Sequence, residues 1–222
     1  ISDTIWAGVR AYNGSGPAAD AYVQKVKAEY ERFYTTAKTA AESTQRVVPG
    51  SALRTIQVPG GPSISLPAQT PQTIAKAITW AFSKYGHPYQ WGGTGSRDSQ
   101  GRDLYDCSSF VTGAYIFADP NLSRIISGPV PGRSHGDTTH TLLANRSLQA
   151  VARTALLPGD MIFFHNSNEA NGHMGMYVGD DMFIHASSSG GVKVSGLGES
   201  YYMTNYSAAR RLINWGPRGT LN

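Results

Sequence analysis

Residues 106–117 read DCSSFVTGAYIF, and residues 173–186 read HMGMYVGDDMFIHA. In the first stretch the apolar side chains after Ser109 recur at helical spacing, so a helix is expected to begin near Cys107. In the second stretch side chains alternate up to Gly179, two aspartates follow as a turn signal, and an apolar run leads on to His185. This pattern predicts a β-hairpin.

Cys107 is the only cysteine of the chain, which excludes an internal disulfide. A lone cysteine is ordinarily a small buried hydrophobe. At the start of a helix, however, unpaired backbone N–H groups and the positive end of the helix dipole favour the thiolate, and the same N–H groups can hold an oxyanion. Asp106 and Ser108 have a second interpretation as plain N-cap residues of this helix.

His173 and His185 lie equally far from Gly179 on the two strands of the predicted hairpin. They are therefore expected to lie near one another. A neutral imidazole acts as a base when its second nitrogen is held by a neighbouring polar group, so the pair suits a base and the residue that orients it. With the thiol of Cys107 this makes a nucleophile, a base and an orienting group.

The chain resembles the NlpC/P60 cysteine peptidases of bacterial cell walls. Four motifs occur in the family's order: His87-Pro88-Tyr89-Gln90-Trp91-Gly92-Gly93, Asp106-Cys107-Ser108-Ser109-Phe110, Leu157-Pro158-Gly159-Asp160-Met161, and the pair His173 and His185. The resemblance implies a papain-like α+β fold, in which a helix bearing the nucleophile packs on an antiparallel sheet bearing the base. The expected substrate is peptidoglycan.

The resemblance also implies roles for individual residues. Cys107 is expected to attack the peptide carbonyl, His173 to act as general base and then acid, and His185 to orient His173. Tyr89, Asp106 and Ser108 match positions that contact the substrate, and Tyr89 is expected beside the thiol. The chain departs from the family at Ser109, where glycine is usual, and in a long interval before His173 whose stretch 128–136 is expected to rim the substrate groove.

Composition and charge narrow the function further. The net charge of +4 is spread along the chain without a basic run, which makes nucleic acid an unexpected partner and suits an anionic wall polymer. No apolar run is long enough to span a bilayer, so an extracellular or wall location with any signal further upstream is expected. His135 and His140 have no carboxylate or cysteine arranged around them as a metal site would need, so no metal is expected. No cofactor is expected either.

The first 70 residues differ in character from the rest. Residues 5–16 resemble the closing A-Y-N-G-G motif of lysozyme-like muramidases and lytic transglycosylases, so residues 1–45 are interpreted as a helical remnant of such a domain. An unrelated amphipathic helix is the alternative. Residues 46–70 are rich in proline and glycine and are interpreted as a linker, and residues 71–222 as the peptidase domain, which opens with a helix near Gln72.

Three functions stay open. The first is a cysteine endopeptidase that cuts the stem peptide between D-γ-glutamyl and the diamino acid. The second is a thiol amidase cutting the muramoyl-L-alanine bond, or an acyltransferase of the same superfamily. The third is a non-catalytic wall-binding or assembly module, whose partner is a secretion, conjugation or phage-tail machine.

Overall fold

The structure is a computed structural model, and it describes residues 16–18, 20, 21, 23, 24, 54–56, 64–132 and 134–215. The chain divides into two compact units, residues 1–48 and 49–222. In the first unit the described residues from 17 to 24 are helical. The muramidase-like motif at residues 5–15, most of the expected helical remnant, and the tail after residue 215 lie outside the described residues.

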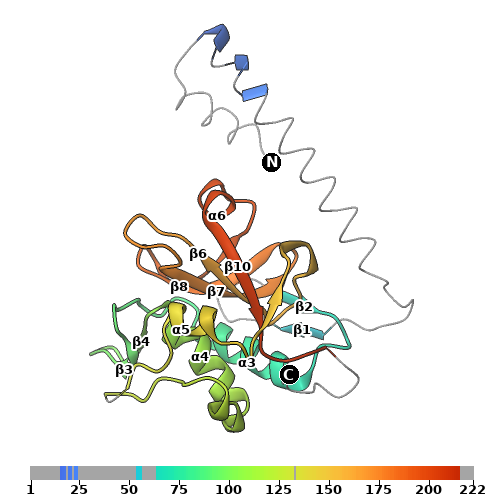
Figure 1. Cartoon of the computed structure of the whole chain (residues 1–222). Coiled ribbons are helices and arrows are strands. Elements are labelled where there is room, and N and C mark those ends of the chain that lie inside the picture. Colours follow the sequence, from blue (N-terminus) through green and yellow to red (C-terminus); the bar gives the residue numbers. More distant parts are fainter. Residues whose placement is uncertain are drawn as a thin grey trace. The chain divides into compact units, whose positions relative to one another are not determined.

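The second unit is built on one antiparallel sheet of six strands, in the order β5-β10-β6-β7-β8-β9 (Figure 1). Its strands are β5 (Gln149–Val151), β6 (Met161–Phe164), β7 (His173–Gly179), β8 (Met182–Ser187), β9 (Gly191–Gly196) and β10 (Tyr206–Arg211). Two short sheets accompany it: β1 (Arg54–Ile56) with β2 (Ile64–Leu66), and β3 (Thr94–Arg97) with β4 (Asp103–Tyr105). The helical elements are α3 (Gln72–Ser83), α4 (Cys107–Ala118), α5 (Thr139–Ala144), α6 (Ser200–Asn205) and the 3-10 turns η1 (Pro120–Arg124) and η2 (Arg153–Ala155).

Helices α3 and α4 pack against each other on one side of the large sheet (Figure 1). The helix face of α4 that carries Phe110, Val111, Ala114 and Tyr115 is fully buried or nearly so. On β7 and β8 the alternate residues Met174, Met176, Val178, Ile184 and Ala186 belong to the same apolar cluster. The α+β fold is therefore confirmed, with the helix that begins at Cys107 packed on an antiparallel sheet.

The opposite face of the sheet holds a second, aromatic cluster. Phe164, Tyr177 and Phe183 come from three neighbouring strands, and Tyr202 covers them from α6. Ring centroids of Phe164 lie 5.0 Å from Phe183 and 5.1 Å from Tyr202. This cluster forms an apolar floor on the face of the sheet that also bears the side chains of alternate residues His173 and His185.

The hairpin of β7 and β8 is confirmed, and its turn has a clear physical cause. Asp180 and Asp181 both have positive φ, 51° and 55°, as the two central residues of a type I′ turn require. Aspartate tolerates this left-handed region better than most residues with a side chain. The two-residue turn joins the strands closely, with Gly179 paired to Met182.

Residues 54–56 and 64–66, within the range interpreted as a linker, form two short strands. β1 and β2 pair antiparallel, from Arg54 opposite Leu66 to Ile56 opposite Ile64. Leu66 is fully buried, and all three apolar side chains Ile56, Ile64 and Leu66 belong to the core cluster that includes α3 and α4. Burial of these apolar groups, which a proline- and glycine-rich composition does not reveal, makes them part of the second unit.

The Leu157-Pro158-Gly159-Asp160 motif shapes the sheet. Asp160 is 1% exposed and receives two hydrogen bonds from the guanidinium of Arg211, each 2.7 Å, which ties the start of β6 to the end of β10. Tyr115 of α4 donates its hydroxyl to the carbonyl of Gly159. These contacts lock the helix and two strands together.

Among the described residues no helix is both long and apolar enough to cross a membrane.

Candidate active site

Cys107 is the first residue of α4, as the sequence predicts, and its side chain is buried. Burial raises the pKa of the thiol to about 12, and the neighbouring charge of Asp106 acts in the same direction. The backbone N–H groups of Met174, Ser108 and Cys107 itself donate toward the sulfur and lower its pKa, but they do not offset the burial. The expected preference for the thiolate is therefore wrong for the resting site, where the thiol is neutral.

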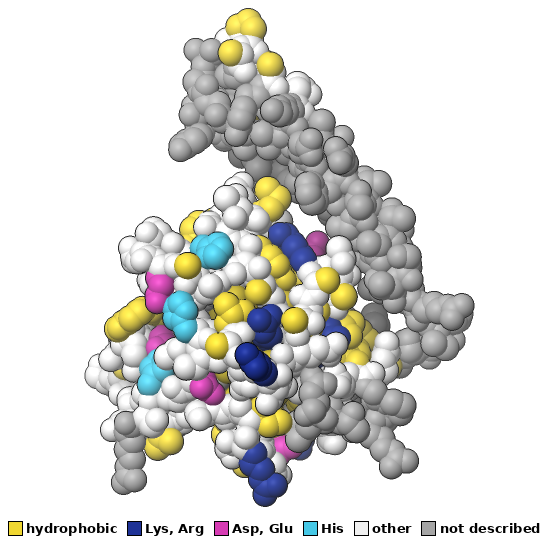
Figure 2. Space-filling model, viewed as in Figure 1, with side chains coloured by type: hydrophobic (Ala, Val, Ile, Leu, Met, Phe, Trp, Pro, Cys, Tyr) yellow, Lys and Arg dark blue, Asp and Glu magenta, His cyan; other side chains and the backbone are white. Residues whose placement is uncertain are grey.

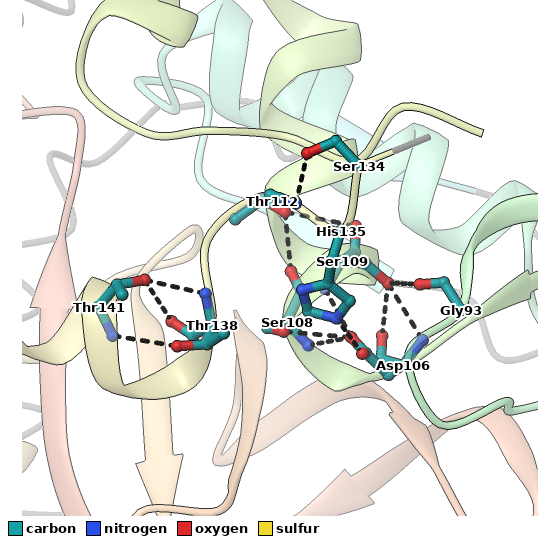
Figure 3. A network of polar contacts seen from close by, with 10 residues as sticks. Gly93, Asp106, Ser108, Ser109, Thr112, Ser134, His135, Thr138 and Thr141 are labelled. Atoms are coloured by element: carbon teal, nitrogen blue, oxygen red, sulfur yellow. Dashed lines mark hydrogen bonds and ion pairs between the residues drawn. The ribbon is translucent and has the colours of Figure 1, made fainter. Parts of the chain in front are cut away.

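Asp106 caps the helix that carries the thiol (Figure 3). Its Oδ1 accepts the backbone N–H groups of Ser108 at 3.1 Å and Ser109 at 2.9 Å, and also the Ser108 hydroxyl at 3.1 Å. The Ser109 hydroxyl in turn accepts the N–H of Asp106 at 3.1 Å, which completes a capping box. The N-cap interpretation of Asp106 is thus confirmed.

Ser109, the residue that departs from the family's glycine, has its own function in this network. Its hydroxyl donates a 2.6 Å hydrogen bond to the carbonyl of Gly93, in the segment that leads from Tyr89 into β3 (Figure 3). Ser109 is fully buried. The hydroxyl therefore joins the start of the nucleophile helix to the loop that carries Tyr89.

His173 and His185 are in contact, which confirms their expected proximity. Nε2 of His173 lies 2.7 Å from Nδ1 of His185. The strand register differs from the symmetric hairpin expected: Met176 pairs with Ile184, and the register shifts near the turn, so that the two histidines are diagonal neighbours and Gly175 lies opposite His185. A Cβ at Gly175 would lie 3.1 Å from that of His185, so the missing side chain makes room for the second imidazole.

Both imidazoles are neutral in this environment. Burial lowers the pKa of His173 to about 4, and the charge of Lys193 adds to the shift. Burial also places the pKa of His185 well below its usual range, with further contributions from His173 and Lys193. Because Nε2 of His173 is engaged with His185, Nδ1 is the nitrogen of His173 left for a proton transfer. The N–H of the next residue, Met174, faces the thiol.

Tyr89 lies at the same site, as expected. It forms a bridge with Tyr105, the residue before Asp106, and its side chain is partly buried. Burial raises the pKa of Tyr89 to about 12, and the nearby carboxylate of Asp106 acts in the same direction. The hydroxyl of Tyr89 is therefore protonated near the thiol and can donate a hydrogen bond.

His135 is a contact of the site that sequence reasoning missed. Its Nε2 contacts Oδ2 of Asp106, in the network of Figure 3. His140 similarly contacts Glu169, with 2.6 Å between Nε2 and Oε1. Each of the two histidines thus contacts a carboxylate that lies 29 residues away in the chain. Figure 2 shows histidine and acidic side chains side by side on one face.

Two further residues beside His185 were also missed. The hydroxyls of Ser195 and Tyr202 lie 3.3 Å and 3.4 Å from its Nε2. Ser195 lies in β9, where it pairs with Phe183 of β8, and Tyr202 lies on the short helix α6 that follows β9. The sequence holds no motif for either contact, because both depend on the strand register and on how α6 folds back.

The sequence profile of the NlpC/P60 family matches residues 86–211. This is more than half of the chain, and the chain belongs to the NlpC/P60 family. The peptidoglycan DL-endopeptidase CwlO of Bacillus licheniformis is 33% identical to it over 141 residues, which are 63% of this chain and 28% of that protein. The murein DD-endopeptidase MepH of Escherichia coli is 27% identical over 148 residues, 66% of this chain and 48% of that protein.

Solved structures of the same family also match. An NLP/P60 family protein of Staphylococcus aureus aligns with a TM-score of 0.47 and 23% identity, covering 64% of this chain and 42% of that one. The chain spans less than half the length of CwlO and MepH.

Proposed function

We propose that the chain is a peptidoglycan endopeptidase that cuts the stem peptide with Cys107 as its nucleophile. The observation that carries the proposal is the buried thiol at the first residue of α4, beside a strand whose first residue, His173, belongs to a hydrogen-bonded pair of neutral imidazoles. The family membership and the names of relatives such as the peptidoglycan DL-endopeptidase CwlO support it.

In this mechanism His173 takes the thiol proton at Nδ1 while Cys107 Sγ attacks the scissile carbonyl carbon. The carbonyl oxygen becomes an oxyanion, and the backbone N–H of Cys107 is the proposed donor to it, with Tyr89 as a further donor. The N–H groups of Ser108 and Ser109 already bond the Asp106 carboxylate. The imidazolium of His173 then gives its proton to the leaving amine, and the C–N bond breaks. Water, deprotonated by His173, hydrolyses the thioester and restores the thiol.

His185 is the proposed orienting residue. Its Nδ1 accepts the N–H that His173 carries at Nε2, and this hydrogen bond fixes the ring of the base. A neutral partner leaves the imidazolium of His173 without a carboxylate to stabilise it. The proton is therefore proposed to move from the thiol to His173 only when the substrate carbonyl is bound. The free protein then holds a neutral thiol and a neutral imidazole.

The proposed substrate contacts differ in accessibility. Tyr89 is partly buried, whereas Asp106 and Ser108 are 6% and 3% exposed. Both oxygens of the Asp106 carboxylate already have partners within the protein. We therefore propose Tyr89 as the direct contact with the stem peptide, and Asp106 and Ser108 as contacts that become available only where the substrate displaces an existing hydrogen bond.

The bond that is cut is proposed to be the one between D-γ-glutamyl and the diamino acid. CwlO is named a DL-endopeptidase, but MepH is named a DD-endopeptidase. Both names support cleavage of peptide bonds in peptidoglycan, but they differ in the bond that is cut. Digestion of purified peptidoglycan followed by mass spectrometry of the new amino termini tests this. A new amino-terminal diamino acid with a free carboxyl on D-glutamate is the expected product.

Other products would support other proposals. A new amino-terminal L-alanine would identify the muramoyl-L-alanine amidase, and a cut at a D-alanyl crosslink would identify a DD-endopeptidase. Binding of the wall without any new terminus would leave the non-catalytic module for a secretion, conjugation or phage-tail machine. An extracellular or wall location is proposed together with the substrate.

We propose that residues 71–222 hold the catalytic domain, and that β1 and β2 stabilise it from the preceding range. Residues 1–45 are proposed to be the end of a lysozyme-like domain that has no glycosidase activity by itself. The test compares chains starting at Pro49 and at Pro71. The longer should retain the thermal stability of the whole second unit, and the shorter should melt earlier because it lacks the buried side chains Ile56, Ile64 and Leu66. Equal melting temperatures would show that β1 and β2 lie outside the cooperatively folding unit.

A further inference from the structure

The two nitrogens of His185 face different chemistry. Nδ1 lies 2.7 Å from Nε2 of His173, whereas Nε2 lies near two hydroxyls, 3.3 Å from Ser195 Oγ and 3.4 Å from the Tyr202 OH. The three partners come from three elements, β7, β9 and α6. His185 is fully buried, and Ser195 and Tyr202 are 4% and 7% exposed. The contacts thus form a closed chain inside the protein.

A hydrogen bond between two neutral imidazoles permits two proton arrangements. If His173 donates from Nε2, its Nδ1 carries a lone pair and can take a proton from the thiol. If His185 donates from Nδ1 instead, His173 must carry its own proton at Nδ1 and cannot act as a base there. The productive arrangement therefore requires His185 to hold its proton at Nε2.

We propose that Ser195 and Tyr202 are positioning residues whose hydroxyl oxygens accept a hydrogen bond from the N–H at Nε2 of His185 and so keep its Nδ1 as the acceptor for His173. This inference rests on the proposed function of His173 as the base. It extends the pair of histidines to a buried chain from His173 through His185 to two hydroxyl oxygens.

A count of donors and acceptors supports this arrangement. The two hydroxyl oxygens have four lone pairs and two hydrogens between them. More acceptor positions than donors are therefore left near Nε2, and this favours an N–H rather than a lone pair on that nitrogen.

His185 is shielded from solvent by aromatic rings. The ring centroids of Phe183 and Tyr202 lie 4.7 Å and 5.5 Å from that of His185, and the side chain of His185 has no exposed surface. An N–H at Nε2 without a hydroxyl partner would be buried and unsatisfied, which is costly. Loss of both hydroxyls should therefore move the proton of His185 to Nδ1.

Long-range ¹H–¹⁵N spectra of the whole chain with ¹⁵N-labelled histidine test the inference, because they distinguish a protonated ring nitrogen from one with a lone pair. In the wild type His185 is expected to be protonated at Nε2. In the Ser195→Ala/Tyr202→Phe double variant the signal should move toward the Nδ1–H tautomer, and kcat should fall by about 10-fold with KM nearly unchanged. Ser195→Thr, which keeps a hydroxyl, should retain the wild-type tautomer.

Tyr201→Phe is the matched control, because Tyr201 is half-exposed and loses the same hydroxyl without contact to Nε2. It should leave both spectrum and kcat unchanged. An Nδ1–H tautomer in the wild type, or an unchanged tautomer in a folded double variant, would overturn the inference. Because the spectrum does not depend on turnover, a wild type that cuts no peptidoglycan yet shows the tautomer shift would contradict the proposed function alone.

Discussion

Four of the six histidines of the protein lie in two contrasting environments. His173 and His185 lie on the aromatic face of the sheet and contact each other, and burial keeps both imidazoles neutral. His135 and His140 lie in the segment between α4 and β5, and each contacts a carboxylate. The side chain of His135 is 30% exposed and that of His140 is 49% exposed. The same residue type is thus proposed for proton transfer in one region and contacts a carboxylate nearer the surface in the other.

The difference shows what burial contributes to the proposed chemistry. A buried imidazole beside another neutral imidazole can exchange a proton with the thiol without first being charged by solvent. An imidazole paired with a carboxylate in partial contact with water mainly positions two chain segments, and such pairs contribute little free energy. Substitutions in the two regions should therefore differ by orders of magnitude in their effect on catalysis.

The largest difference is expected between His173→Ala and His140→Gln. Removing the proposed base should lower kcat by about 10²- to 10⁴-fold, because the thiol is neutral and has no other base. His140→Gln removes only an exposed ion pair and should stay close to wild type. Rates of stem-peptide cleavage at saturating substrate measure both. Similar losses in the two variants would remove the distinction between the regions.

Acid should destabilise the pair formed by His185, which is fully buried, and His173, which is partly buried. The pKa of His173 is about 4 in the folded protein, below its usual value of 6.5, so the unfolded chain binds more protons between these values. The free energy of unfolding should therefore fall as the pH drops from 6.5 to 4, by up to about 3 kcal/mol from His173 alone. His185 acts in the same direction.

Urea unfolding at several pH values measures this slope. In His185→Gln the loss between pH 6.5 and 4 should be smaller, since one of the two buried imidazoles is gone. His140→Gln should keep the wild-type slope. A free energy of unfolding that is constant over this range would contradict the neutral state of the pair.

A smaller effect on catalysis is expected for His185→Gln. The amide oxygen of glutamine can still accept the Nε2–H of His173, so kcat should fall by about 10-fold, much less than for loss of the base. His185→Leu, which has no acceptor, should lose more. If the glutamine variant were folded and as inactive as His173→Ala, the orienting function of His185 would be incomplete as stated.

The smallest effect is expected for His135→Gln. Asp106 keeps its three donors from Ser108 and Ser109 when the ion pair is removed, so the helix cap should survive. We expect a loss of less than about 1 kcal/mol in the free energy of unfolding and a small change in kcat/KM. Asp106→Ala should cost about 0.5–2 kcal/mol through the lost cap. A hundredfold fall in kcat for His135→Gln would place His135 in the chemistry itself.

The elements of the site were predictable where their signals are local. The helix start at Cys107 and the hairpin of His173 and His185 follow from periodicity and a turn signal, and the four motifs in order indicate the family and its α+β fold. The proximity of the two histidines could be predicted from the hairpin alone. The register shift near Gly179 makes them diagonal neighbours, but it leaves them in contact.

The remaining features depend on distant parts of the chain. His135 reaches Asp106 from 29 residues away, and Ser195 and Tyr202 reach His185 only through the pairing of β8 with β9 and the return of α6. β1 and β2 were hidden because their short strands lie among prolines and glycines and gain stability from the core rather than from their own sequence. Burial also reversed the expected charge of the thiol, since a sequence shows the helix start but not the depth at which it lies.

The central claim is that the thiol of Cys107 performs the cleavage. Wild type and Cys107→Ala are incubated with the same purified peptidoglycan, and the new amino termini are counted by mass spectrometry after circular dichroism and thermal melting have shown that both are folded. The substitution is small, so the fold should persist, while cleavage should fall to the level of the blank. A folded Cys107→Ala protein that still releases stem-peptide fragments at the wild-type rate would contradict the account.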